Sequence, residues 1–154
     1  MCSKLMELWN CKKVLPAVFN KRMQAARAHI DFAMRVAVEQ IKAGRFFAFE
    51  QPSSASSWRL ASVVRVAATP GGACVRFDMC SFGMRAPHNG TLIRKRTVIM
   101  TNHPGIKRAL RGKLCSRNHA HVRIQGTDKG VQLSTWCQIY PKALVETIAQ
   151  TLAH

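Results

Sequence analysis

The chain has 154 residues, with 24 Lys and Arg against 7 Asp and Glu, and a formal net charge of +17. Its apolar content of 47% with 20% charged residues is typical of a globular domain and excludes a disordered chain. No apolar run approaches the roughly 20 residues of a membrane span, and so large a positive charge predicts a nucleic acid as partner. The alternative is that the excess of Lys and Arg only reflects solubility or chance and serves no partner.

The predicted elements alternate between helices and strands. Apolar residues recur at helical spacing from Pro16 to Gly44, where Pro suits a helix start and Gly a helix stop. The aromatic run over 45–50 predicts a strand buried on both faces, with Glu50 at its end. The remaining elements are expected as a helix over 58–67, strands over 73–79 and 97–101, a helix over 105–111, a short strand within 131–140 and a helix over 141–152.

This order predicts an α/β domain of three layers with a small, mainly parallel sheet. Open α/β sheets bind ligands at the carboxyl ends of their strands, so a carboxylate at the end of a strand is placed for chemistry. Glu50 is therefore a candidate site residue in a chain with few acids. The alternatives are that it caps the next helix or pairs with an arginine.

The N-terminus carries no secretory signal, and the six cysteines are scattered without a disulfide-like framework. We expect these cysteines to stay reduced. The sequence therefore predicts an intracellular protein, nuclear or cytoplasmic, without a membrane partner.

Several short motifs occur in a characteristic order. They are Met1-Cys2-Ser3, Glu50-Gln-Pro52, Ser56-Ser-Trp58, Asp78-Met-Cys-Ser-Phe-Gly83, Lys95-Arg96-Thr97 and Met100-Thr-Asn102. This order resembles the catalytic portion of a C5-cytosine DNA methyltransferase-like domain, of the divergent type found in phages and mobile-element polyproteins. The likeness covers roughly residues 46–102 and implies a Rossmann-like fragment that makes up residues 1–154.

The resemblance implies roles for particular residues. Cys2 falls where the family has its nucleophile, which adds to cytosine C6, and Glu50 falls where a glutamate holds the ring. Lys95, Arg96 and Thr97 fall where the family contacts its substrate. An active domain of this kind would use S-adenosylmethionine as the methyl donor.

The sequence also departs from the family. Glu50 is followed by Gln rather than Asn, and Arg96 stands where close relatives have Pro. The family's cofactor-binding part precedes its nucleophile, whereas only Met1 precedes Cys2 here. We therefore expect this part to be lacking or supplied by a second chain. The alternative function is a non-catalytic basic domain that binds nucleic acid, with DNA favoured over RNA.

Basic residues are dense on both sides of the strand predicted over 97–101. The candidate nucleic-acid contacts are Arg94, Lys95, Arg96, Thr97, Lys107, Arg108 and Arg111. Gathered around one cleft they would neutralise phosphates, and the binding would depend strongly on salt. The alternative is an even spread over a solvated surface.

A separate pattern of cysteine and histidine follows the basic helix. Cys115, His119 and His121 have a spacing that can ligate zinc, with Cys80 or Cys137 as the fourth ligand. The alternatives are a chance cluster, or histidines that contact phosphates or bases from one side of a strand. Zinc is therefore a candidate cofactor.

Overall fold

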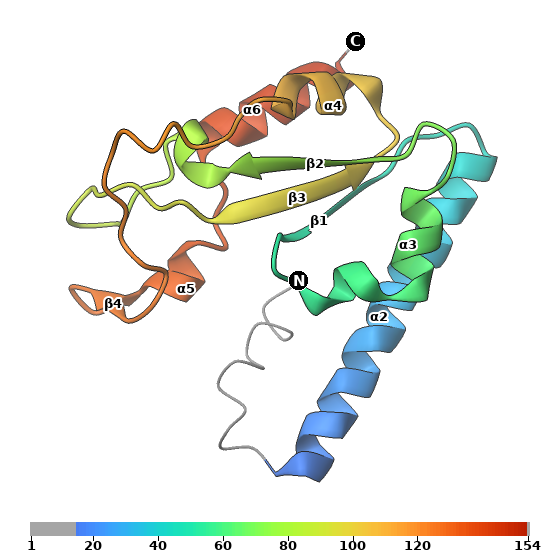
Figure 1. The fold of residues 1–154 in the computed structure, drawn as a ribbon, viewed down its shortest axis with the longest axis horizontal. Coiled ribbons are helices and arrows are strands. Elements are labelled where there is room, and N and C mark those ends of the chain that lie inside the picture. Colours follow the sequence, from blue (N-terminus) through green and yellow to red (C-terminus); the bar gives the residue numbers. More distant parts are fainter. Residues whose placement is uncertain (1–14, 154) are drawn as a thin grey trace.

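The computed structural model describes residues 15–153, in which helices and strands alternate along the chain (Figure 1). The larger elements are α2 (Pro16–Lys42), β1 (Ala48–Pro52), α3 (Ala61–Ala67), β2 (Ala73–Asp78), β3 (Arg96–Thr101), α4 (Pro104–Leu110) and α6 (Lys142–Leu152). The smaller ones are the 3-10 helices η2 (Ser56–Arg59) and η3 (Met79–Phe82), the strands β4 (Thr127–Asp128) and β5 (Val131–Gln132), and α5 (Leu133–Trp136). No helix in this part of the chain is both long enough and apolar enough to span a membrane.

The main sheet has three strands in the order β1-β3-β2, and β3 is antiparallel to both neighbours. The prediction of a mainly parallel, Rossmann-like sheet is therefore wrong. The strand–helix–strand order that suggested it is present, because β1 and β2 run in the same direction and α3 connects them. However, β3 inserts between these two strands, which converts a parallel pair into a split β-α-β unit. A second, two-stranded sheet pairs β4 with β5, also antiparallel.

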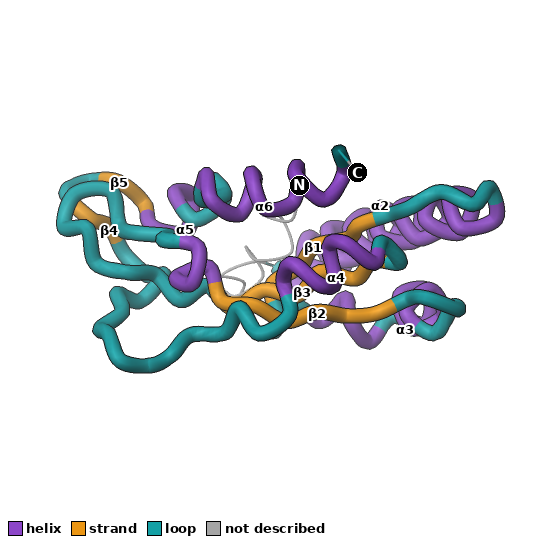
Figure 2. The backbone as a smooth tube through the Cα atoms, turned by 90° about the horizontal axis from the view of Figure 1, so that it is seen from above, coloured by secondary structure: helices purple, strands orange, loops and turns teal. Residues whose placement is uncertain are grey.

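Helices cover both faces of the main sheet. Ile99 and Met100 are neighbours in β3 and point to opposite faces, as successive strand residues must. On the Met100 side the core contains Ile30 of α2 and Val63 of α3. On the Ile99 side it contains apolar residues of β2, α4, α5 and α6, including the fully buried Leu110. Figure 2 shows α6 and α3 on opposite sides of the strands.

The central strand brings two segments to one corner of the sheet. Asp78, the last residue of β2, pairs in register with Arg96, the first residue of β3. The chain enters η3 directly after Asp78, and the backbone N–H of Met79 donates to the carbonyl of Lys95 at 3.0 Å. The start of η3 and the segment before β3 are thus held together at this corner, where the candidate site lies.

Candidate metal centre and its basic surroundings

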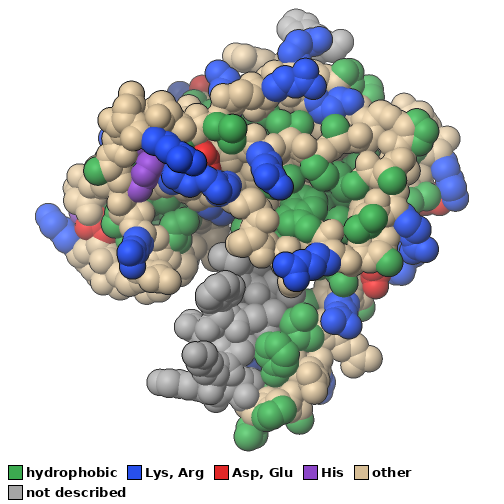
Figure 3. Space-filling model, viewed as in Figure 1, with side chains coloured by type: hydrophobic (Ala, Val, Ile, Leu, Met, Phe, Trp, Pro, Cys, Tyr) green, Lys and Arg blue, Asp and Glu red, His purple; other side chains and the backbone are tan. Residues whose placement is uncertain are grey.

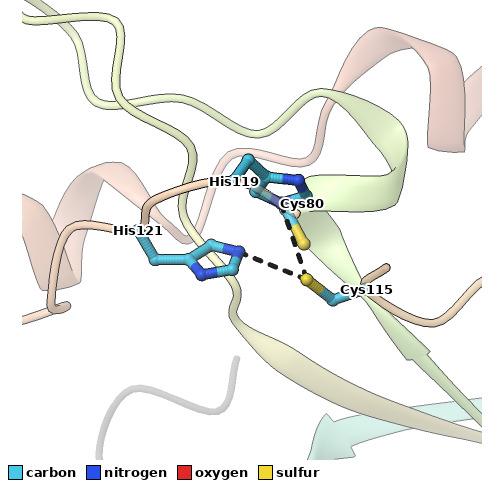
Figure 4. A group of neighbouring side chains, drawn as sticks. All are labelled: Cys80, Cys115, His119 and His121. Atoms are coloured by element: carbon cyan, nitrogen blue, oxygen red, sulfur yellow. Dashed lines mark hydrogen bonds between the residues drawn. The ribbon is translucent and has the colours of Figure 1, made fainter. Parts of the chain in front are cut away.

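Two cysteines and two histidines converge beside the end of β2 (Figure 4). Cys80 belongs to η3, whereas Cys115, His119 and His121 belong to the loop between α4 and β4. Their ligand atoms all lie within 4.8 Å of one another, and Figure 4 shows the four side chains pointing toward a common centre. Of the two cysteines that the sequence left open as a fourth ligand, the structure thus places Cys80 in the cluster. Cys137 instead packs in the core, where it is 2% exposed.

The Sγ atom of Cys115 lies close to both histidines of the cluster. It is 3.5 Å from Nε2 of His119 and 3.4 Å from Nε2 of His121. Both imidazoles therefore present the same ring nitrogen to the thiol. The two rings contact each other edge to face, with centroids 4.6 Å apart.

The loop that carries three of these residues is fastened to β2 through Asp78. Oδ2 of this buried carboxylate accepts a hydrogen bond from the backbone N–H of Cys115 at 3.0 Å. The backbone N–H of Asp78 in turn donates to the carbonyl of Lys113 at 2.9 Å. These two bonds hold the backbone of residues 113–115 against the end of the strand, which brings Cys115 next to η3.

The electrostatic surroundings favour the neutral forms of Cys80 and His121. Burial, followed by the neighbouring Cys115 and the negative charge of Asp78, raises the pKa of Cys80 to about 11. Burial lowers the pKa of His121, with smaller contributions in the same direction from His119 and Arg94. A neutral imidazole keeps a lone pair on one ring nitrogen, and a bound cation would favour the thiolate over the thiol.

Arginines lie around Asp78 beside the cluster. Oδ1 of Asp78 is 3.5 Å from Nε of Arg96 and 3.9 Å from Nε of Arg94, and this oxygen is buried without a hydrogen bond. Arg94 and Arg123 also line a hollow of about 510 Å³ together with residues 122, 124 and 125, which follow His121 in the chain. Asp78 is thus a single acid beside two arginines of one segment, and Arg94 also joins this segment to Arg123 of the loop.

Two further cations flank Cys115 in the chain, Lys113 and Arg117, and both are exposed. We call the cations of these two segments the Asp78 basic surface: Arg94, Arg96, Lys113, Arg117 and Arg123. Within residues 15–153, the other ion pairs join Lys42 to Glu39 and Lys142 to Glu146, on α2 and α6. The Asp78 basic surface therefore carries five cations against one paired acid, and Figure 3 shows Lys and Arg side chains beside a histidine on this part of the molecule.

The predicted nucleic-acid contacts do not form one group. Arg94 and Arg96 belong to the Asp78 basic surface, but Nζ of Lys95 turns to the carbonyl of Cys137 at 3.0 Å and lies over the ring of Tyr140. Thr97 is fully buried in β3. Three predicted contacts lie on or just after α4, namely Lys107, which donates to the carbonyl of Gly71, and the exposed Arg108 and Arg111.

The residues assigned to methyl-transfer chemistry lie elsewhere. Glu50 is in the middle of β1 opposite Ile99, not at the end of a strand, and its Oε2 accepts a hydrogen bond from the Tyr140 hydroxyl at 2.7 Å. Its other oxygen is buried without a hydrogen bond among the described residues. Cys2 lies outside the described residues. The structure therefore does not test the pairing of Cys2 with Glu50.

Comparisons with protein-family models, with curated proteins and with solved structures found no match to this chain. The resemblance to C5-cytosine methyltransferases therefore stays a prediction.

Sequence reasoning missed three residues that shape this region. Asp78 was quoted only as the start of a motif, and Arg117 and Arg123 stand alone between uncharged neighbours, outside the basic runs. One signal was available for Asp78, because an acid within the predicted strand over 73–79 is unusual in a chain with seven acids. No comparable signal marks the two arginines, whose positions depend on the path of the loop.

Proposed function

We propose that this chain is a non-catalytic domain that binds nucleic acid, with DNA as the first ligand to test, through the Asp78 basic surface. The observation that supports this proposal is that Arg94 and Arg96 face Asp78, while the loop that carries Lys113, Arg117 and Arg123 is bonded to the same corner and brings Arg123 beside Arg94. These cations come from two segments, 94–96 and 113–123, that the bonds to Asp78 hold together.

Arginine is well suited to this role. Its planar guanidinium stays charged and can donate two parallel hydrogen bonds to a phosphate. Each phosphate neutralised by such a group releases condensed counterions, which makes the affinity salt-dependent. A net charge of +17 adds long-range attraction that raises the rate of encounter with a polyanion.

Methyl transfer, the other function suggested by the sequence, stays a prediction. It requires a thiolate, an acid and a cofactor at one place. Glu50 accepts a hydrogen bond from Tyr140 in the middle of an edge strand, and Cys2 lies outside the described residues. Binding by charge requires none of these groups, so the geometry favours the binding function.

The test is fluorescence anisotropy with labelled single-stranded DNA, duplex DNA and RNA, measured over a range of salt concentrations. The variant Arg94→Gln/Arg117→Gln/Arg123→Gln removes three cations but keeps Arg96 as a partner for Asp78. If each arginine contacts one phosphate of a duplex, the slope of log K against log salt becomes shallower by about 2.7, from 0.9 for each contact.

The matched control is Lys21→Gln/Arg22→Gln/Arg27→Gln, which removes three exposed cations from α2. It changes the net charge by the same amount on a different part of the molecule. We expect this control to bind much more tightly than the first variant. Equal losses in the two variants would show that the net charge alone drives binding and would contradict a localised surface, and no binding by the unaltered chain would refute the function.

A further inference from the structure

We propose that Cys80, Cys115, His119 and His121 form a closed, structural site for one Zn²⁺ ion. This proposal does not depend on nucleic-acid binding, because it rests on the donor set and its geometry. Two sulfurs and two imidazole nitrogens are a donor set that zinc takes in structural sites. Four protein ligands would leave no open coordination position, so the site would stabilise the fold rather than catalyse a reaction.

The separations between donor atoms agree with a tetrahedral ion. Zinc bonds of about 2.3 Å to sulfur and about 2.0–2.1 Å to nitrogen place the ligand atoms roughly 3.3–3.8 Å apart. The two distances from Cys115 Sγ to the histidine Nε2 atoms, 3.5 and 3.4 Å, lie inside this range. Because no pair of donors exceeds 4.8 Å, the widest pair would need to close by only about 1 Å.

Neighbouring groups already orient the donors. Nδ1 of His119 lies 3.0 Å from Oδ1 of Asn118, so a proton on Nδ1 leaves the Nε2 lone pair directed into the cluster. The backbone N–H of Arg117 donates to Cys115 Sγ at 3.3 Å, which stabilises negative charge on that sulfur. Arg117 adopts a left-handed backbone with φ of 63°, which a tight turn around the sulfur requires. Partners of this kind are common around metal ligands in proteins.

The position of the four donors in the fold indicates what the ion would stabilise. The loop from 111 to 126 contains no helix or strand, and three donors lie on it, while the fourth lies in η3. An ion would therefore cross-link this loop to the end of β2. Binding would release the two thiol protons to solvent, and the two thiolates would balance the charge of Zn²⁺. The site would thus add no net charge to the neighbouring arginines.

The experiment uses the full chain, stripped of metal under reducing conditions and titrated with Co²⁺ in place of Zn²⁺. Tetrahedral Co²⁺ with thiolate ligands gives intense visible bands and a sulfur-to-metal charge-transfer band. We expect saturation at one ion per chain, loss of these bands when Zn²⁺ is added, and one zinc per chain by elemental analysis. Zinc should also raise the melting temperature.

Matched variants identify the ligands. Cys115→Ser and His121→Asn should each lose the tetrahedral spectrum, whereas Cys74→Ser, at an exposed cysteine of β2 outside the cluster, should keep it. The pair Cys2→Ser/Cys11→Ser should also keep it. Circular dichroism of each apo variant checks that the fold persists.

Absence of a saturable Co²⁺ spectrum in the folded chain would overturn the proposal. It would also be overturned by a spectrum that Cys115→Ser keeps or that Cys2→Ser/Cys11→Ser loses. Neither result depends on nucleic acid, so failure of the zinc site and failure of the binding function are distinguished by separate measurements.

Discussion

Asp78 offers a sharp test of how this corner of the fold is held together. Its side chain is 3% exposed, with Oδ2 bonded to the Cys115 N–H and Oδ1 facing Arg94 and Arg96. The substitution Asp78→Asn removes the negative charge but keeps an oxygen that can accept the N–H. Asp78→Ala removes both the charge and the acceptor. The difference between the two variants isolates the hydrogen bond.

The structure determines the expected magnitudes. The side chains of Arg94 and Arg96 are 32% and 47% exposed, so solvent screens their pairing with Asp78. Removal of the charge in Asp78→Asn should therefore lower the free energy of unfolding by about 1 kcal/mol. Leaving the Cys115 N–H without an acceptor costs about 1–3 kcal/mol more. We therefore expect Asp78→Ala to lower the free energy of unfolding by about 2–4 kcal/mol. For a chain of this size, each kcal/mol corresponds to about 2–4 °C in Tm.

The assay is urea unfolding followed by circular dichroism, with EDTA present so that metal binding does not contribute. The control is Asp31→Asn, because Asp31 accepts a hydrogen bond from Ser62 and is only half-buried. We expect the control to cost under about 1 kcal/mol. If Asp78→Ala and Asp78→Asn were equally stable, the hydrogen bond from Cys115 would not contribute to stability. If both variants lost only as much stability as the control, the idea that Asp78 holds this corner of the fold together would be refuted.

Three further predictions concern the core, a buried acid and the metal. Leu110→Ala should cost about 2–5 kcal/mol in urea unfolding, because Leu110 is fully buried, whereas Leu114→Ala, at a residue 55% exposed, should stay within about 0.5 kcal/mol. The backbone N–H of His88 lowers the pKa of Asp128, so Asp128→Asn should lower the free energy of unfolding at pH 7. This difference between the two proteins should diminish as the pH falls below about 3.9 and vanish below the lowered native pKa. A difference that does not change with pH would contradict this prediction. EDTA should weaken DNA binding by the unaltered chain but not by the Cys115→Ser variant. An equal effect of EDTA on both proteins would show that metal at this site does not influence DNA binding.

The helices could be predicted from the sequence because their signals are local. Apolar spacing and the Pro and Gly at its ends predicted a helix over 16–44, and α2 spans Pro16–Lys42. The closing helix was predicted over 141–152, and α6 spans Lys142–Leu152. Such spacing arises within one element, so it needs no knowledge of the partners against which the helix packs.

The strand pairing could not be predicted in the same way. The strands were expected at 45–50, 73–79 and 97–101, close to β1, β2 and β3. However, their order depends on where β3 docks, and a fully buried central strand has the same apolar pattern in a parallel and an antiparallel sheet. The insertion of β3 between β1 and β2 also moved Glu50 from an expected strand end to the middle of an edge strand.

The candidate metal cluster was partly visible in the sequence. Cys115, His119 and His121 are close along the chain, so their spacing alone suggested a site. The choice between Cys80 and Cys137 is long-range, because it depends on whether the loop packs against η3 or against the core around α5. The hydrogen bond from Cys115 to Asp78 fastens the loop beside η3, and it links residues 37 positions apart.

The proposed zinc site and the proposed nucleic-acid-binding surface both contact the carboxylate of Asp78. One oxygen of Asp78 fixes the backbone of Cys115, and the other faces Arg94 and Arg96. An ion that held Cys115 in place would therefore also hold the acceptor geometry on which the arginine positions depend. The loop carries Arg117 and Arg123 as well, so its release would move these cations away from the segment before β3. Because the two thiolates would balance the charge of Zn²⁺, the site would affect the affinity for a polyanion only through the positions of these arginines. Loss of the ion would then weaken that affinity although the number of cations stays the same.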